Sequence, residues 1–134
     1  MSNQKMVFIN LPVKNLNESI QFYNAIGFHQ NMQFSDDTAA CMVLTESIYV
    51  MLLTHKKWQT FTTKQIPNAH QSAQVMIALS NNSKNEVDQM IQNGASAGGT
   101  ADPNPVQDLG FMYGRSLEDP DGHIIETFWM NMPS

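Results

Sequence analysis

The sequence has little of what marks a secreted or nucleic-acid-binding protein. It contains one cysteine, Cys41, so no disulfide can form within the chain, and this fits a reducing compartment. Cys41 lies in an apolar, strand-like run, which predicts a small core residue rather than a nucleophile. Only 14% of the residues are charged, the net charge is −5, and no basic cluster is longer than Lys56-Lys57. We therefore expect no nucleic acid and no anionic membrane surface among its partners.

Long apolar runs are also missing. No segment approaches the roughly 20 apolar residues that a membrane-spanning helix needs. The polar N-terminus, Met1 to Lys5, lacks the apolar stretch of a signal peptide, so we expect a cytoplasmic protein. The chain has 134 residues, of which 42% are hydrophobic, and we expect one domain over residues 1–134 with a substantial core.

What the sequence does contain is an internal repeat, and its first copy lies near the N-terminus. Residues 6–13 have the composition of a strand, and residues 15–26 have apolar side chains at helical spacing. Asn15 followed by Glu18 is typical of a helix N-terminus, and Gly27 lies where a helix end is expected. This segment predicts a strand followed by a capped helix.

The second copy appears after a shift of 68 residues, which places Phe8 on Met76. A strand is predicted over residues 74–80, a helix cap at Ser83, and a glycine stop at Gly94. The same order of strand, cap, helix and glycine in both places indicates two structurally similar halves.

Further strands are predicted after each helix. In the sequence they fall at residues 28–34, 38–44, 48–53, 95–100, 110–118 and 123–130. We therefore predict an α+β fold of two βαβββ modules, which form curled mixed sheets around a concave cavity with the helices outside. The expected modules are residues 6–54 and 73–131, joined by a connector over residues 55–72.

Two stretches resemble a known family. The segment NLPVKNLNESIQFYNAIGF is similar to the first strand and helix of the glyoxalase/bleomycin resistance/extradiol dioxygenase (vicinal oxygen chelate) superfamily, and SLEDPDGHIIETFW is similar to its last hairpin. The resemblance covers residues 6–130, and its wording is nearest to lactoylglutathione lyase-like members. It implies the two-module fold described above.

The resemblance also indicates where a metal would bind. Metal-using members hold a divalent metal between two residues from each half, typically His, Gln or Glu. In this chain the corresponding positions carry Phe8, Met51, Met76 and Glu126. Phenylalanine cannot act as a ligand, methionine thioethers suit copper(I), and one carboxylate does not hold a catalytic metal. The four histidines form no HxH or HxxxH pair. We therefore expect no metal site and no cofactor.

Strand alternation predicts which side chains share the face of these positions. The predicted ligand pocket is mostly apolar with a few polar groups, which is typical of small-molecule sites, and consists of Phe8, Asn10, Met51, Leu53, Met76, Tyr113, Arg115, Glu126 and Phe128. Glu126 is the candidate catalytic residue, either as a general base without a metal or as an acceptor for a ligand hydroxyl or amine. Arg115 is its candidate partner.

Three functions fit these observations. The first is metal-independent binding of a small hydrophobic or amphipathic molecule, as in the superfamily's drug-sequestering members, which implies a homodimer. The second is a metal-dependent lyase or isomerase of the glyoxalase type, which needs a metal site that these residues do not supply. The third is an interaction module without a ligand. Metal content distinguishes the second from the others, and a ligand-induced stability shift distinguishes the first from the third.

Overall fold

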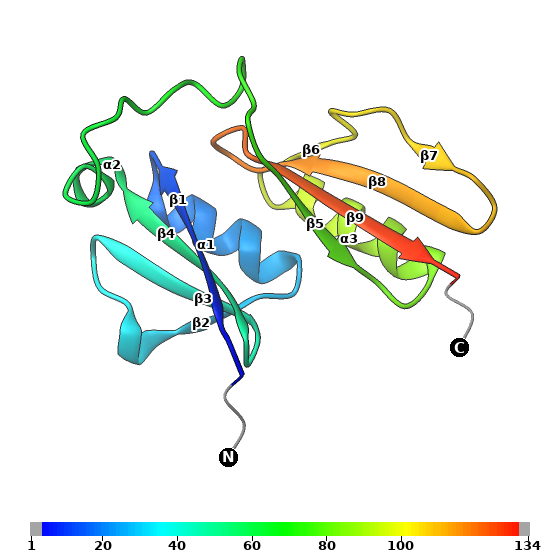
Figure 1. The fold of residues 1–134 in the computed structure, drawn as a ribbon, viewed down its shortest axis with the longest axis horizontal. Helices are drawn as coiled ribbons and strands as arrows, with labels where there is room; N and C mark the ends of the chain where they lie inside the picture. Colours follow the sequence, from blue (N-terminus) through cyan, green and yellow to red (C-terminus); the bar gives the residue numbers. More distant parts are fainter. Residues whose placement is uncertain (1–3, 132–134) are drawn as a thin grey trace. The chain divides into compact units, whose positions relative to one another are not determined.

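The computed structural model describes residues 4–131 and divides the chain into two compact units, residues 1–67 and 68–134 (Figure 1). Each unit is an α+β structure with its own mixed sheet. No helix among the described residues has the length and apolar character needed to span a membrane. The predicted α+β class with two similar modules is confirmed.

Unit 1 has four strands, one long helix, one short helix and a 3-10 turn. In chain order these are β1 (Val7–Val13), α1 (Leu16–Ala25), β2 (His29–Asn31), η1 (Met32–Phe34), β3 (Ala39–Thr45), β4 (Ile48–Thr54) and α2 (His55–Trp58). The sheet order is β1-β4-β3-β2, with β1 parallel to β4 and the other pairs antiparallel. The strand order therefore places β1 at one edge of the sheet, as Figure 1 shows.

The helix α1 forms where its capping signals predict. The Oδ1 of Asn15 accepts a hydrogen bond from the backbone N–H of Glu18 at 3.1 Å, and Gly27 adopts a φ of 109° just after the helix. Phe22 and Tyr23 on its inner side are fully buried. The helix contacts β2, β3 and β4, so one face of the sheet becomes the core of unit 1.

The two faces of this sheet differ because side chains alternate along each strand. Val50 and Leu52, which alternate on β4, are almost completely buried. On the other side Met51 is half-buried, and Phe8, the β1 partner of Tyr49, is 51% exposed. Unit 1 thus has a helix-covered face and an open face.

Unit 2 repeats this plan. Its elements are β5 (Met76–Ser80), α3 (Lys84–Ser96), β6 (Thr100–Ala101), β7 (Gln107–Asp108), β8 (Met112–Glu118) and β9 (Ile124–Met130). The sheet order is β5-β9-β8-β6, with β7 also paired to β8, and β5 is parallel to β9. The strands β5, β9, β8 and β6 therefore correspond to β1, β4, β3 and β2.

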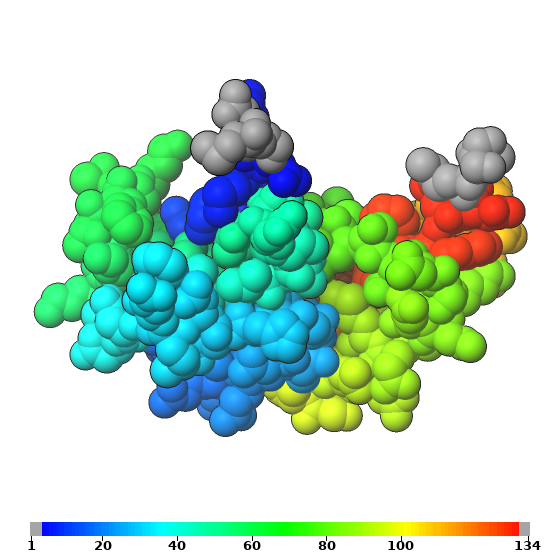
Figure 2. All heavy atoms as spheres, turned by 90° about the horizontal axis from the view of Figure 1, so that it is seen from below, coloured from blue at the N-terminus to red at the C-terminus, as the bar shows by residue number. Residues whose placement is uncertain are grey.

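The helix α3 covers one face of the second sheet. The Oγ of Ser83 accepts a hydrogen bond from the N–H of Glu86 at 3.1 Å, as the repeat predicts. Val87 and Ile91 are buried on its inner side, where the helix contacts β8 and β9. Its outer side is polar and forms part of the surface of unit 2, drawn yellow-green in Figure 2.

The end of α3 differs from the prediction. Gly94 does not stop the helix; it is buried within it, and its carbonyl accepts hydrogen bonds from the N–H groups of Ala97 and Gly99. The left-handed conformation falls instead on Gly98, which has a φ of 101°. The strand predicted over residues 95–100 is therefore wrong, and only Thr100–Ala101 pairs with β8.

The strand predicted over residues 28–34 is also shorter than expected. It ends at Asn31, whose Oδ1 accepts a hydrogen bond from the N–H of Gln33 at 3.0 Å. This side-chain bond competes with strand pairing and turns the next three residues into η1.

The turn before β9 is held by short-range contacts. The buried Asp119 carboxylate accepts hydrogen bonds from the N–H groups of Asp121 and His123, both at 2.9 Å. Gly122 has a φ of 99°, and a Cβ at this position would lie 2.4 Å from the backbone nitrogen of His70. The close approach of residues 69–70 therefore requires a glycine here.

Candidate functional site

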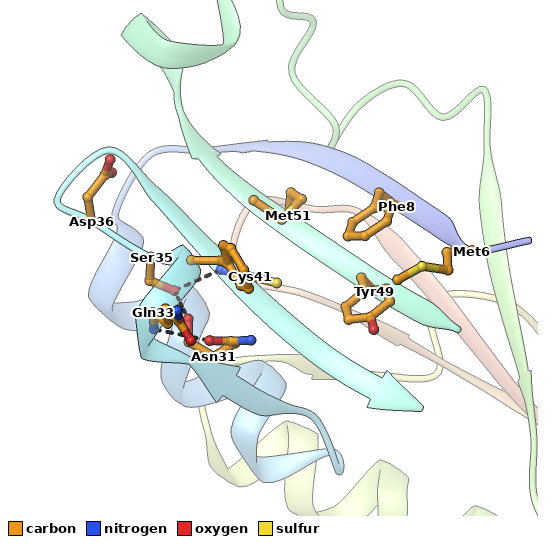
Figure 3. Close-up of a pocket in the computed structure, with 10 residues that line it drawn as sticks. Met6, Phe8, Asn31, Gln33, Ser35, Asp36, Cys41, Tyr49 and Met51 are labelled. Atoms are coloured by element: carbon orange, nitrogen blue, oxygen red, sulfur yellow. Dashed lines mark hydrogen bonds between the residues drawn. The ribbon is translucent and has the colours of Figure 1, made fainter. Parts of the chain in front are cut away.

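The open face of unit 1 carries a cavity of about 770 Å³. Figure 3 shows that its residues come from all four strands and from the turn after β2. They are Met6, Phe8, Asn31, Gln33, Phe34, Ser35, Asp36, Cys41, Tyr49 and Met51. This volume lies within the range of about 300–1,000 Å³ that is usual for small-molecule sites.

One wall of this cavity is aromatic and rich in sulfur. The rings of Phe8 and Tyr49 are stacked, with their centroids 4.4 Å apart and their planes 7° from parallel. Met6 and Met51 line the cavity with them. Thioether chains are flexible and polarisable, and they adapt to irregular or aromatic surfaces. This wall is suited to an apolar ligand.

The opposite end of the cavity is polar. It combines neutral hydroxyl and carboxamide groups with one carboxylate, Asp36. Ser35 donates a hydrogen bond to the carbonyl of Asn31 at 2.6 Å and accepts one from the N–H of Cys41 at 3.0 Å. The side-chain NH₂ of Asn31 and the side-chain amide of Gln33 have no hydrogen-bond partner within residues 4–131. Two carboxamides therefore remain available to a ligand.

The two titratable groups in this cavity have different surroundings. Hydrogen bonds from the backbone and side chain of Thr38 hold the pKa of the Asp36 carboxyl below its usual range. Burial raises the pKa of the Cys41 thiol, whose residue is 3% exposed. The thiol is therefore protonated at neutral pH and is a poor nucleophile. The prediction that Cys41 is a small core residue is confirmed.

Unit 2 has a second cavity, of about 460 Å³, also on its open face. It is lined by Met76, Asn104, Pro105, Gln107, Met112, Gly114, Arg115, Ser116, Glu126, Thr127 and Phe128. Glu126 is half-buried, and its carboxylate has no hydrogen-bond or ion-pair partner in the part of the chain that the structure describes. A carboxylate in this state is free to accept a hydrogen bond from a ligand or from solvent.

The segment after β6 borders this second cavity and is tied to the sheet. The N–H of Asn104 donates to the Oγ of Ser116 at 3.0 Å, and its side-chain NH₂ lies 3.4 Å from the sulfur of Met76. The N–H of Asp102 donates to the carbonyl of Ser116 at 2.8 Å. These bonds fix one side of the cavity.

Arg115 does not pair with Glu126, contrary to the expectation from sequence. The register of β8 and β9 sets Ser116 opposite Glu126 and Arg115 opposite Thr127, so the arginine side chain points to the helix-covered face. There its guanidinium donates to both oxygens of Asp102, at 3.0 and 2.7 Å, and to Asp88 at 2.9 Å.

Tyr113 points the same way as Arg115, and its hydroxyl donates to the carboxylate of Asp88 at 2.6 Å. This bond and the nearby guanidinium lower the pKa of Asp88, and the bond to Asp88 raises the pKa of Tyr113. The hydrogen bonds that the guanidinium donates to Asp102 and Asp88 raise the pKa of Arg115. These hydrogen bonds join α3, β8 and the segment after β6. They therefore stabilise the fold of unit 2.

The remaining predicted pocket residues divide between the two cavities. Phe8 and Met51 line the cavity of unit 1, whereas Met76, Glu126 and Phe128 line that of unit 2. Asn10 and Leu53 line neither cavity. Asn10 is exposed at the sheet surface, and Leu53 is buried in the core.

The sequence prediction missed several lining residues. Tyr49 alternates with Met51 on β4, so the two-residue period of a strand could have found it. Asn31 and Gln33 could not be found in this way, because they reach the cavity through the η1 turn that replaced a predicted strand.

The residues at the family's metal positions do not fit a divalent metal. Phe8 and Met51 offer no oxygen or nitrogen donor in unit 1, and in unit 2 Met76 accompanies a single carboxylate, Glu126. Within residues 4–131 no group of three or more His, Cys, Asp or Glu side chains is placed to hold an ion. Nickel, zinc and manganese prefer imidazole and carboxylate donors, which are scarce here.

Comparison with solved structures supports the fold. A hypothetical protein from S. aureus is 30% identical, with a TM-score of 0.77, and the match covers 96% of this chain and 95% of that one. A glyoxalase/bleomycin resistance protein/dioxygenase family enzyme from Burkholderia phytofirmans PsJN is 14% identical, with a TM-score of 0.78 and coverage of 95% and 99%. The fosfomycin resistance protein FosX from Listeria monocytogenes is 17% identical, with a TM-score of 0.69 and coverage of 99% and 96%.

The last two similarities concern the fold alone, since both identities are low. No curated protein gives a significant match. The profile of the Glyoxalase/Bleomycin resistance protein/Dioxygenase superfamily, however, matches residues 5–127. The chain therefore belongs to the Glyoxalase/Bleomycin resistance protein/Dioxygenase superfamily.

Proposed function

We propose that this protein binds a small hydrophobic or amphipathic molecule without using a metal. The observation that carries the proposal is the cavity of unit 1, which holds about 770 Å³ on an open sheet face. Its wall of Phe8, Tyr49 and Met51 is apolar, and at its other end lie two carboxamides that have no partner among the described residues. An apolar cavity with a few convergent polar groups is the usual form of a small-molecule site.

The donor chemistry favours binding over metal-dependent catalysis. The superfamily includes metal-dependent enzymes, in which a Lewis-acidic ion polarises substrate oxygens. Here Phe8, Met51 and Met76 stand where the metal-binding donors would be, which disfavours metal-dependent catalysis. Lyase or isomerase activity of the glyoxalase type is therefore the alternative to our proposal. Glu126 retains a role in our proposal, as an acceptor for a ligand hydroxyl or amine in the cavity of unit 2.

A homodimer in the cytoplasm is part of the proposal. On the open face of unit 1, Met6 and Phe8 are 49% and 51% exposed. Apolar groups gathered in this way are suited to contact with a ligand or with a second copy of the chain. Sedimentation of the purified protein would show a mass of two chains, and a single chain at all concentrations would remove the dimer from the proposal.

Two measurements test the proposed function. The purified, untagged protein is incubated with nickel, zinc, manganese or iron and then analysed for metal content. In parallel, its melting temperature is recorded against a panel of small apolar and amphipathic molecules. We expect no stoichiometric metal and at least one ligand that raises the melting temperature by several degrees, because a ligand at about 100 times its Kd adds about 2.7 kcal/mol of stability.

The opposite results are equally informative. One tightly held metal per chain would contradict the proposal and make hemithioacetal isomerisation the next assay. No stabilisation by any member of the panel, together with no metal, would favour an interaction module without a ligand.

A further inference from the structure

The geometry of the Phe8–Tyr49 pair defines how the wall of the unit 1 cavity is shaped. The two residues are direct partners on the neighbouring strands β1 and β4. Their centroid distance of 4.4 Å is close to the spacing of about 4.8 Å between strands. The rings therefore stand upright on the sheet, with their faces directed across the strands (Figure 3).

One face of the Tyr49 ring is covered by Phe8, and the other is directed toward β3. The strand order β1-β4-β3-β2 places β3 on the side of Tyr49 that is away from Phe8. The cavity extends in this direction, because its lining includes Cys41 on β3 and Asn31 on β2. The second face of Tyr49 therefore lies on the side of the cavity that extends toward β3 and β2.

The side chains of β3 that lie beside Tyr49 and Met51 are short. Val43 is the partner of Tyr49 on β3, and Cys41 is the partner of Met51. Of the two, Cys41 lines the cavity, between Tyr49 and Met51 on β4 and Asn31 on β2. A flat molecule in this region would continue the row of rings that Phe8 and Tyr49 begin.

The polar end of the cavity adds a second requirement. Oδ1 of Asp36 already accepts hydrogen bonds from the N–H groups of Thr38 and Ala39 and from the Thr38 hydroxyl. The Ser35 hydroxyl is likewise engaged as donor and acceptor. Within residues 4–131 this leaves the second oxygen of the Asp36 carboxylate, which can accept from a hydroxyl, and the side-chain amides of Asn31 and Gln33, which complement a neutral hydroxyl or carbonyl.

We propose that the cavity of unit 1 binds a planar aromatic molecule that carries a neutral hydroxyl or carbonyl group. The aromatic ring stacks on the second face of Tyr49, and the polar group bonds the carboxamides of Asn31 and Gln33. This proposal rests on the proposed function and narrows it to one class of ligand. Offset stacking of two rings stabilises the contact beyond the burial of apolar area.

A pair of matched probes separates this proposal from general apolar binding. 2-Naphthol and decahydro-2-naphthol have the same carbon skeleton and a hydroxyl at the same position, but only the first has an aromatic face. Because the hydroxyl of 2-naphthol is phenolic and also a stronger donor, the variants below are needed to assign the difference to stacking. Titration calorimetry with the full chain should show that 2-naphthol binds about three- to tenfold more tightly, which is the usual contribution of aromatic stacking. The substitutions Tyr49→Leu and Phe8→Leu should reduce this ratio toward one.

The ratio of the two affinities is insensitive to a general loss of folded protein, because both probes report on the same sample. Phe61→Leu is the matched control: Phe61 is 61% exposed and lies outside the cavity, so the ratio should stay as in the unaltered chain. Equal binding of the two probes would overturn the aromatic proposal and leave the proposed function standing. Failure of both probes to bind would overturn the aromatic proposal, and the melting-temperature panel would then decide the proposed function.

Discussion

The two units share one strand order but differ in the chemistry of their open faces. The parallel pair β1–β4 of unit 1 is equivalent to the pair β5–β9 of unit 2. Met51 of unit 1 therefore occupies the position that Glu126 occupies in unit 2. The open face of unit 1 presents stacked aromatic rings and thioethers. The open face of unit 2 presents a carboxylate that no other residue within 4–131 contacts by a hydrogen bond or an ion pair.

The buried centres of the helix-covered faces differ much less, although the face of unit 2 also carries the bonds of Tyr113 and Arg115 to Asp88. Val50 and Leu52 in unit 1, and Leu117 and Ile125 in unit 2, are all almost fully buried. A helix packed on a sheet requires apolar side chains at these positions in either unit, because a polar group there would lose its hydration. The open faces carry no such packing requirement, so their side chains can differ. The comparison shows where the repeat is constrained by folding and where it is available for function.

The largest expected effect is a loss of folding stability when one of two glycines, one in each unit, is replaced by alanine. Gly122→Ala should lower the free energy of unfolding by about 3 kcal/mol, because the new Cβ meets backbone atoms of residues 69–70 in addition to the cost of a positive φ. Gly27→Ala is the matched control: it has a similar φ of 109° but nothing within 4 Å, and should cost about 1 kcal/mol. Urea unfolding measures both. Equal losses would mean that residues 69–70 are not held against the turn.

Exchanging the chemistry of the open faces should have the next largest effect. Met51→Glu places a carboxylate in the apolar wall of the unit 1 cavity and should weaken 2-naphthol binding by about tenfold or more, because the charge must remain hydrated. The fold should persist, since Met51 is only half-buried. Met32→Glu adds the same charge at a residue that is 71% exposed and outside the cavity, and its affinity should match that of the unaltered chain. The same affinity in both variants would exclude this cavity as the binding site.

Glu126→Gln tests the carboxylate that distinguishes unit 2. We expect the affinity for a ligand with a hydroxyl or amine to fall by about three- to tenfold, because a neutral amide replaces a charged acceptor, which binds about twice as strongly. The melting temperature without ligand should not change. Glu46→Gln removes one exposed carboxylate from unit 1 and serves as the control. Unchanged affinity in calorimetry would remove Glu126 from the site.

The smallest effect concerns acid stability. Hydrogen bonding from Tyr113 and the charge of Arg115 lower the pKa of Asp88 in the folded chain. The resulting stabilisation is present above the unfolded pKa of about 4 and is lost as the pH falls through the folded value, so Asp88→Asn should flatten this part of the stability profile. Because the Asp88 side chain is 51% exposed, the difference should stay below about 1 kcal/mol.

Urea unfolding between pH 2 and pH 7 would measure this difference. Asp37→Asn is the control, since Asp37 is exposed and should leave the shape of the profile unchanged. Identical profiles for Asp88→Asn and the unaltered chain would mean that the bonds to Asp88 contribute nothing to stability.

Local signals in the sequence predicted most of the fold. The caps at Asn15 and Ser83, with the apolar spacing that follows each, gave both long helices, because capping and helical periodicity act over only a few residues. The strand before each helix and the two long strands that end each unit were found from their apolar, strand-like composition. The errors fell at Gly94, which is buried inside a helix, and after Asn31, where a side-chain bond ends a strand.

The candidate site was predictable only in part. The sequence alone determined that Phe8, Met51 and Met76 cannot ligate a divalent metal, since donor chemistry belongs to the residue itself. The tertiary structure decided that Arg115 faces away from Glu126, because a one-residue difference in register reverses the face of a side chain. It also decided the stack of Phe8 on Tyr49, which depends on pairing strands that are distant in the sequence. Residue chemistry and short-range periodicity are written along the chain, whereas register and cross-strand contacts arise only when the sheet is assembled.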